Sequence, residues 1–322
     1  MSRPPTSADV DDAVAFIRPH LPTTPLLRCE GLSHLLGCDY SIKCENLQPV
    51  GAFKVRGGVN LVGRLSSEEK EAGLISASTG NHGQSIAWAG RRFGASVVIY
   101  APAEGANEAK LAAIRHLGAE VRQHGRDFDE ARIAAGQAGD EEGRRFVHSA
   151  NEPQLIAGVG TTGIEILETL PDVETILVPV GGGSGAAGMC LAAKSRNPYI
   201  EVIGVQSASA PAAQQAWAQR RLDIEADTST PHEGMATRVP FEMTMQILWE
   251  QLDDFILVED DEVDAAIRLL AREARLVAEG AGAASLAGAL KLADRLKGRR
   301  VCGVLSGGNL PMARYAGVLS AG

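Results

Sequence analysis

The 322-residue sequence predicts an α/β protein in which helices cover both faces of parallel sheets. From Leu74 onward, short apolar segments alternate with helix-like segments at the pitch of strand–helix–strand units. In addition, two loops rich in glycine and small polar residues, 78–84 and 181–185, each connect an apolar strand to a helix-like segment. Such loops lie at the carboxyl ends of parallel strands, where open α/β sheets bind ligands.

Local patterns predict the individual elements. A helix is expected from Ala8 to His20, because Asp9, Asp11 and Asp12 favour its N-terminus. Short apolar runs predict strands at residues 40–44, 74–77, 96–101, 120–123, 175–180 and 200–205, with another near 146–148. Helical patterns lie at residues 108–117, 128–137 and 152–169, and after both loops. The polar interval 138–145 is the expected hinge.

Composition and charge narrow the classes of function. An apolar content of 45% with scattered charges is ordinary for a globular chain. The formal net charge of −9 disfavours nucleic acid or an anionic membrane as the main partner. No apolar run approaches the roughly 18–20 residues of a membrane span. The segment from Met1 to Pro5 has no apolar signal core, so we expect a cytoplasmic protein.

The cysteines predict neither disulfides nor a metal site. They are odd in number and lack C-x-x-C spacing, so we expect free buried thiols in a reducing compartment. Cys29, Cys38 and Cys44 are close in sequence, but no histidine completes a usual zinc spacing.

Lys54 is the first candidate for chemistry. It follows Phe53 and precedes a short apolar and glycine run, within the stretch from Pro49 to Gly58. A lysine in apolar company is desolvated, which lowers its pKa and favours the neutral amine. A neutral amine can condense with an aldehyde to form a Schiff base. The alternative is an ordinary lysine at a helix start, with its charge in solvent.

The two loops are candidate anion sites. Ser78-Thr79-Gly80-Asn81-His82-Gly83-Gln84 offers hydroxyls, an amide and backbone N–H groups at a helix start, a set suited to a carboxylate. Gly181-Gly182-Gly183-Ser184-Gly185 allows the backbone to close around a phosphate. A glycine run can also be a linker, but linkers are rarely placed between a buried strand and an apolar helix.

Lysine, carboxylate loop and phosphate loop occur here in the order found in fold-type II pyridoxal-phosphate enzymes. The chain resembles the threonine/serine dehydratase and serine racemase branch of that family, from Thr24 to Asn309. The resemblance implies two parallel-sheet, three-layer domains, like those of the tryptophan synthase β subunit, with pyridoxal 5'-phosphate in the cleft. It also implies a large cofactor domain of residues 1–72 and 144–322 and a small movable domain of residues 73–143.

The resemblance further implies roles for individual residues. Lys54 would form the Schiff base and act as a catalytic base, and Thr79 matches a serine that serves as the second acid–base group in racemases. The expected cofactor-binding residues are Phe53, Lys54, Asn81, Gly181, Gly182, Gly183, Ser184, Gly185, Glu279 and Ser306. The expected substrate-binding residues are Ser78, Thr79, Gly80, Asn81 and His82.

Some of these roles have structural alternatives. Ser184 stands where the family usually has a fourth glycine, although a serine still donates its backbone N–H and adds a hydroxyl. His82 also fits a structural histidine packed against Trp88. Glu279 also fits a helix cap or a surface carboxylate. Gly234 matches a glycine beside the cofactor face, but it also fits a plain turn.

The chemistry implied by these parts is a lyase reaction. A 3-hydroxy-L-amino acid (threonine, serine or a β-aryl serine such as phenylserine) would lose water and give a 2-oxo acid and ammonia. A hydroxyl from Ser306 at the ring nitrogen, unlike a carboxylate, does not hold that nitrogen protonated, so prompt loss of the leaving group is favoured. The alternatives are a serine racemase and, more remotely, a non-catalytic protein that binds a phosphate or nucleotide.

Further expectations concern the substrate's far end, metals and assembly. Residues 234–237 are small and flexible and no obvious extra cation closes that end, although Arg238 is near in sequence. Gln206 stands where racemase relatives have a glutamate, and residues 204–212 contain no acidic residue, so no divalent-cation site is expected. The chain ends soon after Ser306, so no regulatory domain is expected. We expect a homodimer that acts on a small amino acid in catabolism.

Overall fold

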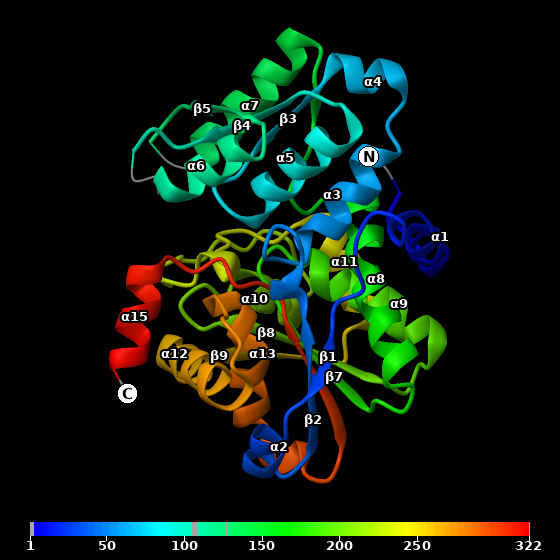
Figure 1. The fold of residues 1–322 in the computed structure, drawn as a ribbon, viewed down its shortest axis with the longest axis vertical. Helices are drawn as coiled ribbons and strands as arrows, with labels where there is room; N and C mark the ends of the chain where they lie inside the picture. Colours follow the sequence, from blue (N-terminus) through cyan, green and yellow to red (C-terminus); the bar gives the residue numbers. More distant parts are fainter. Residues whose placement is uncertain (1–2, 105–107, 127, 322) are drawn as a thin grey trace.

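The computed structural model describes residues 3–104, 108–126 and 128–321, which form two lobes of unequal size (Figure 1). The larger lobe contains a six-stranded sheet in the order β1-β2-β10-β7-β8-β9, and the smaller lobe contains a four-stranded sheet in the order β5-β4-β3-β6. Among the described residues, every pair of strands except β1–β2 is parallel. The predicted α/β class with parallel sheets is therefore confirmed.

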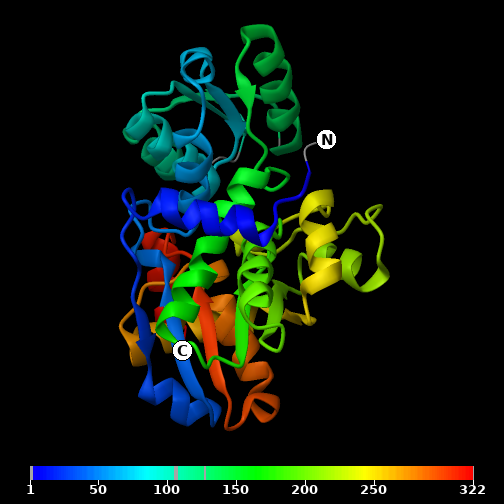
Figure 2. The same cartoon turned by 90° about the vertical axis from the view of Figure 1, so that its right-hand side faces the viewer.

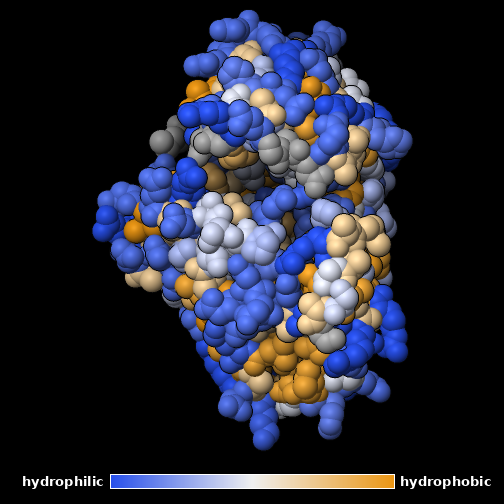
Figure 3. All heavy atoms as spheres, turned by 90° about the vertical axis from the view of Figure 1, so that its left-hand side faces the viewer, coloured by the Kyte–Doolittle hydropathy of each residue, from blue (hydrophilic) through white to orange (hydrophobic). Residues whose placement is uncertain are grey.

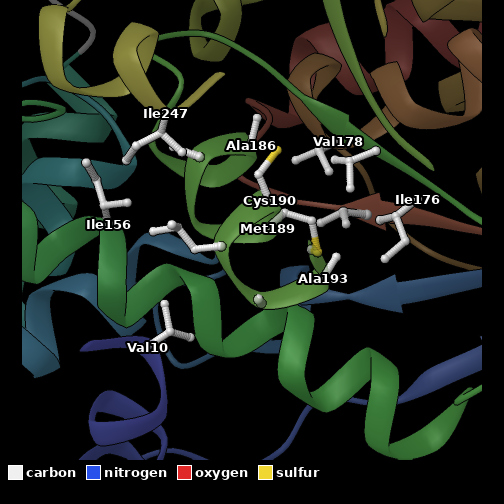
Figure 4. Packing of buried hydrophobic residues seen from close by; sticks show 14 of the residues in the cluster. Val10, Ile156, Ile176, Val178, Ala186, Met189, Cys190, Ala193 and Ile247 are labelled. Carbon is white, nitrogen blue, oxygen red and sulfur yellow. The ribbon is translucent and has the colours of Figure 1, made fainter. Parts of the chain in front are cut away.

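The large sheet is the middle layer of three. Its strands are β1 (Leu26–Arg28), β2 (Asp39–Cys44), β7 (Thr175–Pro179), β8 (Glu201–Ser207), β9 (Asp254–Val258) and β10 (Arg300–Leu305). Successive side chains point to opposite faces, so Ile176 and Val178 join one core while Leu177 joins the other. Figure 4 shows the first of these cores.

Helices cover both faces of this sheet. The first face carries α1 (Ser7–Ile17), α8 (Pro153–Thr169), α9 (Ser184–Arg196), α10 (Ala212–Gln219) and α11 (Glu242–Gln251). The second face carries α2 (Glu30–Leu36), α12 (Asp260–Leu269), α13 (Gly280–Lys291), α14 (Ala293–Leu296) and α15 (Met312–Ser320). Figure 2 shows α1 running across the molecule below the small lobe.

The small lobe repeats this arrangement on a smaller scale. Its strands are β3 (Leu74–Ala77), β4 (Val97–Ala101), β5 (Glu120–Gln123) and β6 (Arg145–Phe146), and α4 (Ser67–Ala72) precedes them. Helices α5 (Asn81–Phe93) and α6 (Glu108–His116) pack on one face, and α7 (Phe128–Glu142) packs on the other. Because β6 pairs with β3, this sheet extends beyond the expected boundary at residue 143.

Several expected elements differ from the structure. The predicted hinge at 138–145 is mostly helix, because the alanine-rich pattern of α7 continues to Glu142 before Gly143 turns the chain at φ 66°. The strand expected near 146–148 lies at Arg145–Phe146 and belongs to the small sheet. The sequence patterns also left β9, β10 and the helices after residue 206 without a prediction.

Helix α3 (Lys54–Gly63) joins the two lobes. It packs against α8 of the large lobe and α5 of the small lobe. A Cβ atom on Gly57 would lie 2.9 Å from the carbonyl oxygen of Leu155 in α8, and one on Gly58 would lie 2.7 Å from the carbonyl oxygen of Ser85 in α5. Both distances are shorter than a carbon–oxygen contact allows, so glycine is required for helix backbones this close together.

A buried ionic network fixes α3 to the large lobe. The Arg56 guanidinium donates to both oxygens of Glu45, at 2.7 and 2.8 Å, and to both oxygens of Glu165, at 2.8 and 2.7 Å. Its remaining contact is a bond to Thr161 Oγ1 at 3.2 Å, and Lys43 Nζ donates to Glu165 at 2.6 Å. Burial raises the pKa of Glu165, but the hydrogen bonds and charges of Arg56 and Lys43 outweigh this effect and hold that pKa below its ordinary value.

The cysteines and the helices bear on two further expectations. All five cysteines are free and buried, which confirms that prediction. Burial raises the pKa of the Cys38 thiol to about 11 and the pKa of the Cys44 and Cys302 thiols to about 12. Within the described part of the chain, no helix has the length and apolar character needed to cross a membrane.

Candidate active site

The predicted functional loops gather between the two lobes. Lys54 is the first residue of α3, the carboxylate loop follows β3, the glycine loop follows β7, and Ser306 follows β10. All three strands belong to parallel pairs, so these loops extend from the carboxyl ends of the sheets. Figure 3 shows that the surface is hollowed between the smaller lobe above and the larger lobe below.

The amine of Lys54 has two acceptors. Its Nζ donates to Ser184 Oγ at 2.7 Å and to the backbone carbonyl of Ser149 at 3.3 Å. The Phe53 ring centroid lies 5.3 Å from Nζ. Burial lowers the pKa of the Lys54 ammonium to about 8, so an appreciable fraction of the amine is neutral near neutral pH. This is the desolvated lysine that the sequence predicts, and it meets the glycine loop directly.

The glycine loop forms a cradle at the start of α9. Gly183 has φ 87°, and a Cβ on Gly181 would collide with the carbonyl oxygen of Gly234. The carbonyl of Gly182 accepts a hydrogen bond from Thr244 Oγ1 at 2.9 Å, which fixes the loop from behind. The first four N–H groups of a helix have no partner within that helix, so those of α9 are available to an anion in the cradle.

A chain of polar side chains joins the two lobes beside Ser306. Asn81 Nδ2 donates to Glu279 Oε1 at 2.6 Å, and Asn309 Nδ2 donates to Asn81 Oδ1 at 2.7 Å. Burial raises the pKa of Glu279 to about 6, although the bond from Asn81 acts in the opposite direction. Ser306 is buried, and its carbonyl accepts a bond from the Phe53 N–H at 2.9 Å. Asn81 and Glu279 are therefore in direct contact, and Ser306 is bonded to Phe53, the residue that precedes Lys54.

The carboxylate loop is held mainly by the small lobe. Ser78 is buried, and its hydroxyl accepts a bond from the Gly80 N–H at 3.1 Å, while Thr79 is partly exposed. The His82 Nε2 lies 2.9 Å from Ser76 Oγ, which itself donates to the carbonyl of Val147. Because that hydroxyl gives its hydrogen to Val147, His82 Nε2 is the donor to Ser76. The ring is thus engaged inside the small lobe, and a contact of His82 with substrate stays a prediction.

Sequence reasoning missed His148. Its Nδ1 accepts bonds from the N–H groups of Ala150 and Asn151, both at 3.0 Å, and its ring meets Phe241 edge-on with centroids 5.1 Å apart. Burial lowers its pKa to about 4, so the ring is neutral at physiological pH. These bonds shape the segment that presents the Ser149 carbonyl to the lysine. The signal available in the sequence was a histidine directly after a short strand.

A cation also lies near the segment from Glu233 to Met235 (η2), contrary to expectation. Lys110 of α6 forms an ion pair with Glu233, across the junction of the lobes. The Lys110 side chain is 16% exposed, and both charges act on Glu279. Lys110 is distant in sequence from every motif that identified the site, so no local pattern indicated it.

Gln206, which stands where racemase relatives have a glutamate, makes protein contacts. Its Oε1 accepts a bond from the Gln214 N–H at 3.0 Å, and its Nε2 lies 3.5 Å from Thr237 Oγ1. Among the residues that the structure describes, no three His, Cys, Asp or Glu side chains gather in a way that would hold a metal.

Comparison with known proteins agrees with this geometry. Residues 17–307 match the family model described as "Pyridoxal-phosphate dependent enzyme". The chain is 38% identical over 317 residues to an L-threonine ammonia-lyase of Thermotoga maritima, covering 98% of this chain and 79% of that protein. It is 37% identical over 318 residues to the catabolic L-threonine dehydratase TdcB of Staphylococcus aureus, covering 98% and 92%.

Solved structures of threonine deaminase and serine racemase are also similar to this chain. A processed threonine deaminase isoform 2 of Solanum lycopersicum superposes with a TM-score of 0.91 at 31% identity, covering 99% of this chain and 96% of that chain. A serine racemase of Dictyostelium discoideum superposes with a TM-score of 0.89 at 30% identity, covering 95% and 99%.

Proposed function

The chain belongs to the family of pyridoxal-phosphate-dependent enzymes as an ammonia-lyase of the threonine dehydratase type, and from this premise we propose that it dehydrates a 3-hydroxy-L-amino acid to a 2-oxo acid and ammonia. The observation that carries the proposal is the contact between the partly buried Lys54 amine and the cradle at 181–185. Family membership sets aside a non-catalytic nucleotide-binding protein. Serine racemase is the second candidate, because a serine racemase structure is 30% identical to this chain.

The residues present fit pyridoxal phosphate. The cradle offers free N–H groups where a Cβ on Gly181 would find no room, and it lies within reach of a partly neutral lysine amine. When bound there, the cofactor supplies an aldehyde that attaches amino groups and a ring that withdraws electrons from the substrate Cα. We assign its phosphate to residues 181–185, its ring to the space beside Phe53, and its polar edge to Asn81 and Ser306.

Lys54 is the proposed proton carrier. With a pKa of about 8, its amine can take a proton from the substrate Cα and later release it to the departing hydroxyl. The loop at 78–82 would bind the substrate carboxylate through its N–H groups and hydroxyls. Movement of the small lobe, residues 73–143 together with β6, would then bring this loop onto the substrate and exclude water.

Thr79 supports elimination over racemisation. A racemase needs a second acid–base group on the side of the substrate opposite Lys54, and Thr79 retains a hydroxyl for this purpose. Its additional methyl group restricts rotation about χ1, which hinders a group that must move to reprotonate Cα. Elimination is therefore the proposed main reaction, with racemisation as a slower side reaction.

The far end of the pocket favours an uncharged β-substituent. Gly234 and Ala236 are small, the Met235 side chain is buried in the core of the large lobe, and the Glu233 carboxylate compensates the charge of Lys110. An additional carboxylate on the substrate would have to compete with Glu233 for that cation. Threonine and phenylserine are therefore the proposed substrates, ahead of 3-hydroxyaspartate.

The test is an assay of keto-acid release from L-threonine, L-serine, phenylserine and 3-hydroxyaspartate, with D-serine measured in parallel. Turnover of threonine and phenylserine should exceed that of hydroxyaspartate, and pyruvate should form from L-serine faster than D-serine does. A preference for hydroxyaspartate would contradict the pocket argument, and faster racemisation would contradict the argument from Thr79. Light scattering should give twice the chain mass of 33.8 kDa if the proposed homodimer forms.

A further inference from the structure

The contact between Lys54 and Ser184 depends on a side chain that a glycine would lack. Ser184 is the first residue of α9, is 2% exposed, and is 130 residues from Lys54 in the chain. A glycine at this position would still give its backbone N–H to an anion, but it would offer nothing to the amine. The hydroxyl therefore has a role separate from that of the glycine backbone around it.

We propose that Ser184 is a positioning residue that holds the free amine of Lys54 in the orientation in which it takes the proton from the substrate Cα and passes it to the departing hydroxyl. This inference rests on the proposed role of Lys54 as the base. The second hydrogen-bond acceptor for the amine is the backbone carbonyl of Ser149. The His148 ring holds this segment in place, because it accepts bonds from the N–H groups of Ala150 and Asn151.

The two hydrogen bonds of the Lys54 amine determine where its lone pair points. A neutral lysine amine has two N–H bonds and one lone pair. Ser184 Oγ and the Ser149 carbonyl take up the two N–H bonds, so the lone pair points away from both acceptors. After the lysine accepts a proton from the substrate Cα, the new N–H lies in that same third direction. The electron pair left at Cα forms the Cα–Cβ double bond as the β-hydroxyl leaves, and the proton held by Lys54 leaves with that hydroxyl as water, so no further reactant is needed.

Without the hydroxyl, the amine would lose its shorter hydrogen bond. The lysine side chain has many accessible rotamers, which a single long bond to Ser149 does not restrain well. The Ser184 hydroxyl can in turn donate its own hydrogen into the cradle, so one side chain links the base to the anion site.

The hydrogen bond from Lys54 to Ser184 should change the pKa of Lys54, and this change can be measured. The charge of Lys54 acts on two titratable groups, His82 on α5 and His148 after β6, and burial lowers their pKa to about 3 and about 4. Both rings are therefore neutral where Lys54 titrates. A hydrogen bond from a charged donor is stronger than one from a neutral donor, so Ser184 stabilises the ammonium more than the amine. Removal of the hydroxyl should lower the pKa of Lys54 by about one unit.

The test measures the reactivity of Lys54 in the 322-residue chain stripped of cofactor. The rate of acetylation of Lys54 by acetic anhydride is followed by mass spectrometry as a function of pH, since only the neutral amine reacts. We expect a midpoint near pH 8 in the parent protein, a midpoint about one unit lower in Ser184→Ala, and restoration in Ser184→Thr, which keeps a hydroxyl. Ser195→Ala is the matched control, because it removes a hydroxyl of the same helix that donates to the carbonyl of Ala192.

A second measurement separates positioning from folding. The cofactor-loaded Ser184→Ala enzyme should show kcat reduced about tenfold with KM changed less than twofold, and Ser184→Gly should behave in the same way with an unchanged melting temperature. An unchanged midpoint for acetylation in both the alanine and glycine variants would overturn the proposal. Because acetylation involves no substrate, this outcome is independent of whether the enzyme proves to be a dehydratase or a racemase.

Discussion

Replacement of Arg56 by methionine tests the buried ionic network most directly. Arg56 and Glu45 are both fully buried, and all five N–H donors of the guanidinium are used. With Arg56 replaced, the carboxylates of Glu45 and Glu165 share the single cation Lys43, so one buried negative charge is left without compensation. The side chain volume is nearly unchanged, and the effect is therefore electrostatic.

Removal of one partner from a buried ion pair costs about 3–5 kcal/mol. Arg56→Met breaks two bidentate pairs at 2.7–2.8 Å, so the free energy of unfolding should fall by about that amount. Addition of Glu45→Gln restores charge balance, because Lys43 then pairs with Glu165 alone at 2.6 Å. The double variant should therefore recover about 1–3 kcal/mol of the loss, as expected for coupled neighbours.

The assay is urea unfolding of the protein stripped of cofactor, followed by the fluorescence of its three tryptophans, of which Trp217 and Trp249 lie in the large lobe. Arg18→Met is the matched control, because Arg18 pairs with Glu168 at the surface, where both side chains are about half exposed. That variant should change stability by about 1 kcal/mol or less. A loss below 1 kcal/mol in Arg56→Met, or additive effects in the double variant, would refute the reasoning.

Three further changes have defined outcomes. Lys54→Ala should abolish the visible absorbance of covalently attached cofactor and reduce turnover by several orders of magnitude, because it removes both the attachment point and the base. Absorbance spectra and keto-acid assays measure these two effects. Prolonged EDTA treatment should leave activity and melting temperature unchanged, because Gln206 offers an amide where a cation would need carboxylates; strong activation by Mg²⁺ or Ca²⁺ would contradict this. Lys110→Met and Glu233→Gln should each alter KM by about fivefold or less. The double variant should change KM no more than either single variant, because all three variants break the same partly exposed ion pair. Additive effects on KM would show that the two residues act separately.

Local patterns predict the parts of the site that depend on local chemistry. Glycines between a strand and a helix indicate the cradle at 181–185, and an apolar setting indicates that Lys54 is desolvated. Both features follow from residues adjacent in sequence, and the structure shows a desolvated Lys54 in contact with this loop. The α/β class follows from periodicity in the same way.

Features made by distant residues could not be predicted. Glu165, for example, is 109 residues from Arg56, and no local pattern links the two. Lys110 and Glu233 are 123 residues apart and meet only because two lobes face each other. Strand β10, the last along the chain, lies between β2 and β7 in the sheet. The order of strands depends on how helices cover the faces, and that packing involves the whole chain.

The adjacent glycines at the start of α3 give the enzyme two separate points for engineering. Gly57 contacts α8 within the large lobe, whereas Gly58 contacts α5 of the small lobe. A methyl group at residue 57 would therefore push α3 away from α8 within the large lobe, and its main effect would be on thermal stability. A methyl group at residue 58 would instead act at the junction of the lobes and would bias how far apart they rest. Selection for access of bulkier substrates would therefore act at residue 58, whereas selection for robustness would retain the glycine at residue 57.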